Sequence, residues 1–221
     1  YATKNQQVSA SATTPTLSGV PPEVQAAFGA QYQAGVAAQA DAMTGKVSGL
    51  GDVELQAGWL HASEKVRVLA GGSLVLPTGR YDSSPGPDIG AGNFYTFRPA
   101  MQVAYLPRPD VAFAGKVTLG LNTTNRDNKL RSGNWIGLEA AAGYMTAVGP
   151  VGVHMIHIQQ YQDDNNNALG ASRLRMSNAG LFFTTMLPVV DAPVTIQYMS
   201  TVSSRNSKSG DFYQVRVVKV F

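Results

Sequence analysis

The residues in this sequence that could carry chemistry are few, and their spacing argues against catalysis or metal binding. Cysteine is absent, so no catalytic thiol and no thiolate metal site can form. His154 and His157 stand three positions apart in a strand-like run, which points them to opposite faces and prevents a shared metal unless a bulge intervenes. A catalytic histidine also needs a Ser or Asp partner, and no G-x-S-x-G motif is present. We therefore predict no catalytic residue, no metal and no cofactor.

The run DDNNNA at 163–168 places Asp163, Asn165 and Asn167 at the spacing of a calcium-binding loop. Ala168 stands where such a loop needs glycine, and Leu174 stands where it needs glutamate, which excludes an EF-hand. A solvated polar loop is the favoured interpretation, and a loose divalent-ion site is the alternative.

Composition narrows the class of protein further. Only 14% of the chain is charged while 44% is hydrophobic, and the net charge is +3. The basic residues are scattered in ones and twos, which argues against a nucleic-acid partner. No run approaches about eighteen consecutive apolar residues, so no transmembrane helix is predicted. The chain opens at Tyr1 without a charged and apolar leader, and we expect a processed form whose signal peptide lies outside it.

From Gly51 onward the sequence falls into strand-length runs separated by turn residues. Short connections such as PRPD at 107–110 alternate with long polar ones such as QDDNNNALGASR at 162–173. This alternation, with aromatic residues near strand ends, is typical of an up-and-down barrel in an outer membrane. A soluble sandwich is the alternative, because its strands also alternate. The predicted strands span 51–61, 65–77, 93–107, 111–123, 133–147, 151–162, 173–187, 193–203 and 211–221.

The first fifty residues read differently. We expect a strand in YATKNQQVSASA and a helix near 20–45, which begins at Ser18 or at the prolines that follow it and acts as a lid or internal plug. About nine strands are readable, an odd number where bacterial barrels are even, so we expect further N-terminal strands beyond this chain. The predicted fold is all-β, an antiparallel up-and-down transmembrane β-barrel forming a single domain over 1–221. Within it, 1–50 is a partial strand plus a long loop and helix, and 51–221 is regular strands.

Alternation within the strands assigns side chains to an inner, lumen-facing side. Charges there favour a structural ion-pair network, with a constriction that orients cargo as the alternative. Apolar side chains there would form an adaptable cargo path, unless a bulge has changed the phase of a strand. The polar lumen candidates are Glu54, Arg67, Arg98, Lys116, Glu139 and Arg216. The apolar lumen candidates are Phe94, Trp135, Met145, Met176, Phe182, Met199 and Phe212.

The chain ends on a strand-like run, GDFYQVRVVKVF, that stops at an aromatic residue. Phe221 follows apolar residues at alternate positions, among them Val217 and Val215, and this pattern resembles the assembly signal of bacterial outer-membrane proteins. Lys219 departs from the pattern. We therefore expect Phe221 to be recognised by the barrel-assembly machinery.

Several motifs together resemble the outer-membrane channels named for the meta-pathway of phenol degradation. The motifs are GLGDVELQAGW at 49–59, LPTGRYD at 76–82, GNFYTFRP at 92–99, RSGNWIGLEAAAGYM at 131–145 and the terminal DFYQVRVVKVF. The resemblance covers about residues 49–221 and implies a monomeric barrel of about twelve strands that takes up hydrophobic, often aromatic, molecules. It supplies no catalytic residue.

These observations predict a passive channel in the bacterial outer membrane for small hydrophobic molecules, aromatic ones among them, and not an enzyme. Its expected partners are the lipid bilayer and lipopolysaccharide, the barrel-assembly machinery, and small hydrophobic molecules or detergent in the lumen, with no nucleic acid. The alternatives are a general diffusion porin for polar solutes, a barrel enzyme that uses His154 or His157, and an adhesive barrel whose loops bind a partner.

Overall fold

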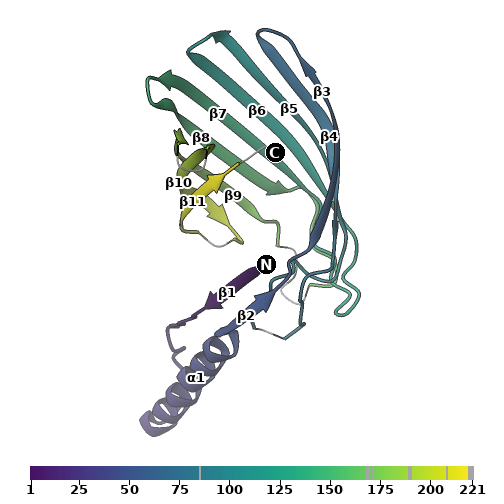
Figure 1. Ribbon diagram of the computed structural model, residues 1–221. Coiled ribbons are helices and arrows are strands. Elements are labelled where there is room, and N and C mark those ends of the chain that lie inside the picture. The colour runs from purple at the N-terminus through teal and green to yellow at the C-terminus, as the bar shows by residue number, and fades with distance from the viewer. Residues whose placement is uncertain (85, 168–169, 171, 189–190, 208, 219–221) are drawn as a thin grey trace. The chain divides into compact units, whose positions relative to one another are not determined.

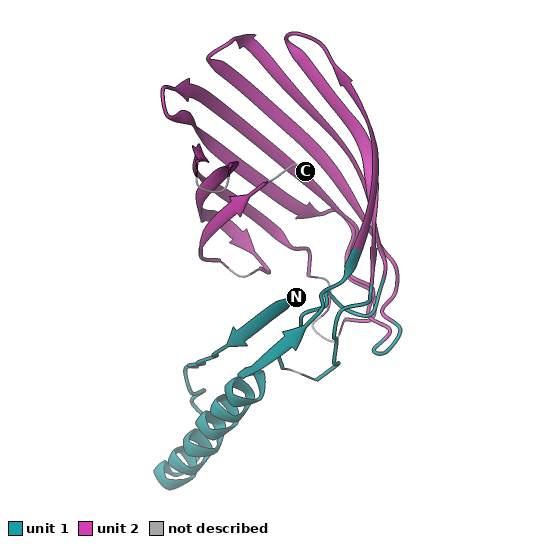
Figure 2. Cartoon of the chain, viewed as in Figure 1, with its two compact units in different colours: residues 1–53, 77–94, 126–128 teal, residues 54–76, 95–125, 129–221 magenta. Residues whose placement is uncertain are grey.

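The computed structural model describes the whole chain except residues 85, 168–169, 171, 189–190, 208 and 219–221. Contacts group the chain into two compact units (Figure 2). Unit 1 comprises Tyr1–Val53, Pro77–Phe94 and Arg126–Asn128, and unit 2 comprises Glu54–Leu76, Tyr95–Asn125 and Lys129–Phe221. A single domain over 1–221 stays a prediction.

Unit 2 is built on a nine-stranded antiparallel sheet in which every strand lies next to its neighbour in sequence (Figure 1). The order β11-β10-β9-β8-β7-β6-β5-β4-β3 is that of a simple meander. The strands are β3 (Val53–Ala62), β4 (Val66–Leu76), β5 (Thr96–Arg108), β6 (Val111–Asn122), β7 (Trp135–Thr146), β8 (Gly149–Gln160), β9 (Arg175–Leu187), β10 (Ala192–Arg205) and β11 (Asp211–Val217). The predicted all-β class and the order of the nine strands are confirmed.

Two strands begin later than the sequence pattern predicted. The predicted strand 133–147 begins two residues later, because the Asn134 side chain accepts a hydrogen bond from the backbone N–H of Asn122 at 2.9 Å. Strand pairing therefore starts at Trp135 opposite Gly120. The predicted strand 93–107 likewise begins later, at Thr96, and Phe94 lies in a bend before it.

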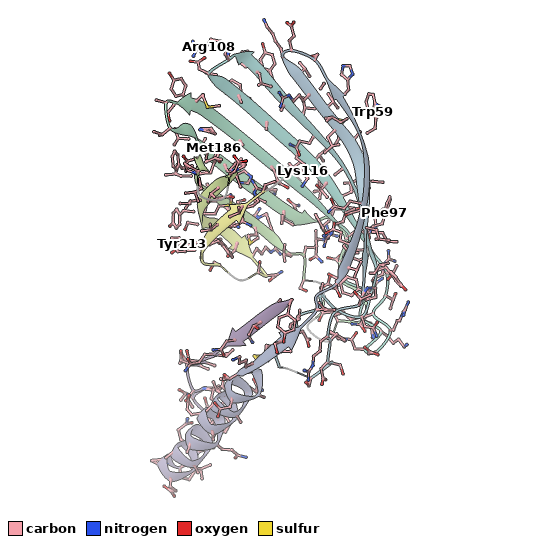
Figure 3. The ribbon with its side chains drawn as sticks, viewed as in Figure 1. Trp59, Phe97, Arg108, Lys116, Met186 and Tyr213 are labelled. Carbon is pink, nitrogen blue, oxygen red and sulfur yellow. The ribbon has the colours of Figure 1, made fainter. Side chains whose placement is uncertain are left out.

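The register lets each face be followed across the sheet. Lys116 is paired directly with Glu139, and we name the side that carries them the inner face. Val117, paired with Leu138, points to the other side, the outer face. Figure 3 shows Lys116 on the concave side of the sheet and Phe97 projecting from the opposite side. Directly opposed residues share a face and successive residues alternate, so this assignment extends to every paired strand.

Two register shifts interrupt the pairing, and both lie near strand ends. One falls between Tyr105 and Arg108 in β5, beside a short turn. The other falls in β10, where Thr201 is opposite Asn178 and Ser203 is opposite Ser177, so that Val202 is one extra residue. The middle of the sheet keeps an unbroken two-residue alternation.

The sheet has almost no apolar core. Within the described chain no large side chain is fully buried, and the buried apolar residues of the sheet are Val75, Ala192, Val194 and Met199. Large apolar side chains of the outer face are instead exposed: Phe97, Met101, Tyr105, Phe113, Leu138, Tyr144, Val153, Met155, Leu181 and Ile196. The outer face is therefore an extended apolar surface with no protein layer packed on it among the described residues.

Polar side chains are buried instead at the ends of the strands that carry the long loops. Thr96 donates to Asn122 at 2.9 Å, and Asn122 donates to the backbone of Ser132 and Gly133. Gln160 donates to Asp164 at 2.9 Å. These hydrogen bonds connect β5 to β8 at one end of the sheet, and burying polar groups with partners avoids their desolvation cost.

The two edges of the sheet, β3 and β11, are not paired with each other in the described structure. Every residue of both strands is exposed. The meander is therefore barrel-like in order and curvature but open, and the expectation of about twelve strands stays a prediction. Phe221 lies outside the described residues, so its role in assembly also stays a prediction.

Unit 1 contains a two-stranded sheet and one helix. β1 (Ala2–Gln6) pairs with β2 (Gly45–Gly49), a strand that the sequence pattern did not predict. The predicted helix near 20–45 is confirmed as α1 (Pro22–Met43), which starts with Pro22 in its first turn. Gln33 donates to the backbone of Ala12 at 2.8 Å, which holds the extended segment before the helix alongside it. Among the described residues, no helix is both long enough and apolar enough to cross a membrane.

Glycines permit close approach in the sheet, and Gly180 on β9 gives a test. A Cβ there would collide with the backbone oxygen of Tyr198 and lie 2.7 Å from the Cα of Met199. Gly180→Ala should lower the free energy of unfolding by about 1–3 kcal/mol, the usual cost of overpacking, as measured by urea unfolding in detergent. Gly115→Ala is the matched control, because its Cβ meets its nearest neighbour at 3.9 Å. Equal stability of the two variants would contradict the packing described here.

Candidate functional site

The inner face carries a row of polar side chains that four strands supply: β6, β7, β8 and β10. Lys116 Nζ on β6 lies 3.0 Å from Glu139 Oε1 on β7. The other oxygen of Glu139 lies 3.7 Å from Nε2 of His154 on β8. Nδ1 of His154 is 2.7 Å from Nε2 of Gln197 on β10. Because the amide donates, this contact makes Nδ1 the acceptor and leaves the proton of a neutral imidazole on Nε2, which faces Glu139.

The last contact of this row crosses an intervening strand. His154 and Gln197 come from strands that are not neighbours, since β9 lies between them. The β9 residue opposite His154 is Gly180. Glycine at this position lets the backbone of β10 lie close to β9, because a Cβ there would collide with the backbone oxygen of Tyr198.

A second polar group lies on β3, β4 and β5. Arg98 Nη1 is 3.5 Å from Glu54 Oε1, and the same carboxylate accepts a hydrogen bond from the Ser73 hydroxyl. The Arg98 guanidinium lies 6.0 Å from the centroid of the Trp135 ring, within cation–π range. Both side chains of the Arg98–Glu54 pair are one-third exposed, so the pair faces open space instead of a closed interior.

Two aromatic rings of the inner face lie flat against the sheet. A Cβ on Gly120 would overlap the indole of Trp135, and a Cβ on Gly137 would lie 3.2 Å from the same ring. Phe182 is placed in the same way over Gly152, whose Cβ would collide with the ring. The rings occupy the volume that side chains at these glycines would fill, and the space above them stays open.

The open space forms two hollows on the inner face. The larger, of about 660 Å³, is lined by the apolar side chains of Leu69, Trp135, Ile156 and Ile158 together with the Arg98 group. The smaller, of about 310 Å³, is lined by Phe182, Gln197 and Arg216 among others. Gln102, Lys116 and Glu139 line both hollows, so the Lys116–Glu139 ion pair stands on the boundary between them.

Comparison with known protein families shows to which family the chain belongs. Residues 8–217 match the family described as "Putative MetA-pathway of phenol degradation". The chain belongs to this family. The match confirms the resemblance drawn from the sequence motifs and extends it to the helix-containing N-terminal segment. A comparison with curated proteins gives no match.

In this phenol-degradation family member, four of the six predicted polar candidates are brought into the two ion-paired groups: Glu54, Arg98, Lys116 and Glu139. Arg216 lies opposite Thr195 and lines the smaller hollow. Arg67 lies opposite Ala104 on the inner face, outside both hollows. That any of these six residues contacts a cargo stays a prediction.

The predicted apolar candidates divide into several environments. Trp135 and Phe182 line the two hollows. Met199 is buried and opposite Phe212, which is half exposed on β11. Met145 lies half exposed beside a short turn, and Met176 contacts the Ser207 hydroxyl at 3.7 Å. Phe94 was expected on the inner side of a strand, and the structure corrects this because Phe94 lies in the bend before β5 and within unit 1.

The structure also shows contacts that the sequence pattern did not reveal. Strand alternation correctly placed His154 and His157 on opposite faces, but the partner of each depends on the register of a neighbouring strand. His157 Nδ1 lies 2.8 Å from the Ser177 hydroxyl on the outer face. Ser177 is paired on both sides, with His157 and with Ser203, so the backbone N–H groups around it belong to the sheet and cannot form an oxyanion hole.

The acidic loop after β8 uses its carboxylates to hold itself together. Asp164 accepts hydrogen bonds from the backbone of Gly133 at 2.7 Å and from Ser172 at 3.1 Å. Arg173 donates to Asp163 at 2.7 Å, and this hydrogen bond holds the pKa of Asp163 below its ordinary value. The ion pair therefore supports the loop above the ordinary Asp pKa and is lost as the pH falls through the lowered value. No cluster of potential metal ligands is found among the described residues.

The Lys116–Glu139 pair can be tested by a double-mutant cycle of Lys116→Met and Glu139→Gln. We expect a coupling energy of about 0.5–1 kcal/mol, discounted for the partial exposure of both side chains, in urea unfolding of the detergent-solubilised protein. The control cycle is Arg108→Met with Asp110→Asn, a pair of 3.2 Å that is more exposed. Coupling no larger than in the control would show that the inner pair adds nothing to stability.

Proposed function

We propose that the protein is a passive outer-membrane channel for small hydrophobic molecules, aromatic ones among them. The observation that carries this proposal is the division of the sheet into an apolar outer face and an inner face with paired charges and hollows. The family, which is named for a pathway of phenol degradation, is compatible with such a cargo.

The outer face supports a lipid environment. Its exposed side chains include Phe113, Leu138, Met155 and Leu181, and a surface of this kind is unstable in water. Transmembrane barrels present an outward apolar band of strand residues to lipid and enclose a polar interior. The alternation of short turns and long loops along the meander fits the same arrangement, with the long loops outside the cell.

The inner face supports a hydrophobic cargo more than a polar one. Four of its charges are neutralised in two ion pairs, at 3.0 and 3.5 Å. The larger hollow offers an indole, a leucine and two isoleucines together with glycines that expose no side chain. A small apolar molecule would lose its water against these groups and pass the Lys116–Glu139 pair without forming a covalent bond.

Trp135 gives the test of this path. Trp135→Gln should reduce the uptake of naphthalene into vesicles that contain the protein by about three- to tenfold, because an apolar contact of the cargo is lost. Trp59→Gln is the matched control, since Trp59 is 65% exposed and projects from the outer face (Figure 3). Heat-modifiable migration on a gel would show that both variants fold. Equal uptake by the wild type and Trp135→Gln would remove Trp135 from the path.

A diffusion porin is the second candidate, because the inner charges are one-third exposed and could line a wet pore. Swelling of protein-containing liposomes in small sugars separates the two functions. Little swelling together with naphthalene uptake supports the proposed channel. Rapid swelling in sugars would replace it with the porin.

A further inference from the structure

Charged residues are almost absent from the outer face of the sheet. In the described strands, the outward positions fixed by the register carry four of them: Arg108 beside a short turn, and Arg175, Arg205 and Asp211 at the long-loop end. Arg108 is ion-paired with Asp110, and Asp211 accepts a hydrogen bond from the Tyr198 hydroxyl. The two arginines at the long-loop end are left to be explained.

Arg175 and Arg205 lie directly opposite each other on β9 and β10. Like charges in directly opposed positions repel and destabilise a sheet. Both side chains are exposed, and within the described residues neither guanidinium has an ion-pair or hydrogen-bond partner. An anion that binds both would remove the repulsion, and the planar guanidinium is suited to bidentate contacts with phosphate.

The outer-face residues that neighbour these two arginines are also polar. His157, Ser177 and Ser203 form one cross-strand row on the outer face, and Gln159 lies opposite Arg175. The imidazole of His157 and the hydroxyl of Ser177 are within hydrogen-bond distance at 2.8 Å. The row supplies polar groups to the headgroup of a ligand whose anionic part lies between the arginines.

The same face becomes apolar and hollow directly below this row. A shallow depression of about 720 Å³ has small residues in its floor, including Ala140, Ala142 and Ala179. Its rim is formed by larger side chains, including Phe113, Met155 and Leu181, which are about half exposed. Ala179 and Arg175 are four residues apart on β9, or about 13 Å, so the depression and the arginines are within the span of one lipid molecule.

The geometry points to a binding site for a phosphate-bearing lipid of the outer leaflet on the face of β7 to β10. A phosphate monoester lies between Arg175 and Arg205, the headgroup contacts the His157–Ser177 row, and an acyl chain fills the depression over Ala142. The two opposed charges favour an anion and the adjoining hollow favours an apolar chain, and together they favour a lipid over a free ion. This inference rests on the proposed placement in an outer membrane but not on the channel activity.

The test measures the binding of diphosphoryl lipid A to the full chain in nonionic detergent by native mass spectrometry. The double variant Arg175→Gln/Arg205→Gln should bind lipid A at least about tenfold more weakly, since charge-assisted hydrogen bonds to phosphate are lost. Lys65→Gln/Arg108→Gln removes the same net charge at the short-turn end and should bind like the wild type. Equal binding by the wild type and the first double variant would overturn the site.

A second pair of variants tests the acyl-chain part of the site without a change of charge. Ala142→Leu fills the depression and should weaken lipid A binding several-fold, whereas Ala70→Leu, on the outer face of β4 away from it, should not. If Ala142→Leu binds normally while the arginine variant fails, the arginines hold the phosphate but the depression does not hold an acyl chain, and that part of the proposal is wrong. Naphthalene uptake by the arginine variant should stay at the wild-type rate, so failure of the lipid site and failure of the channel proposal are distinguishable.

Discussion

The two-residue period of the β-strand is the constraint on which the rest of this structure depends. Because the register is unbroken through the middle of the sheet, each residue position decides whether a side chain faces the concave or the convex side. Charges collect on the inner face and large apolar groups on the outer face. The sheet has almost no apolar core, so it has little burial within itself to stabilise it, and the large apolar side chains of its outer face are exposed.

Glycine has a second role that the alternation alone does not explain. Where an inner-face position is glycine, a neighbouring aromatic ring lies down on it, as Trp135 does over Gly120. Where the glycine is Gly180, the backbone of β10 lies close to β9, and Gln197 contacts His154 across β9. The inner face thus gains stacking and hydrogen bonding close to the backbone while the volume above it stays open. The inner face therefore combines close packing near the backbone with open volume above it.

The sequence predicted the strands, their order and the two faces because these follow from local periodicity and turn chemistry. It predicted Glu54, Arg98, Lys116 and Glu139 for one face, and the structure brings them into pairs. It could not predict the His154–Gln197 contact, because this contact crosses an intervening strand. It also could not predict that Arg175 and Arg205 are opposite each other, because this depends on the register of β9 against β10. Some strand ends escaped prediction: the Asn134 side chain takes the place of a backbone partner before β7, and Phe94 lies in a bend before β5.

The extra residue Val202 in β10 has a consequence for how such a surface could evolve. The register shift accommodates Val202 as an extra residue, so Arg205 lies opposite Arg175 on the outer face, whereas unbroken alternation through Val202 would have turned Arg205 to the concave side. The bulge therefore absorbs one residue of strand length without changing the face on which the following residues lie. A single-residue insertion at this end of the strand can thus be accepted in evolution while the outward pair of arginines is kept.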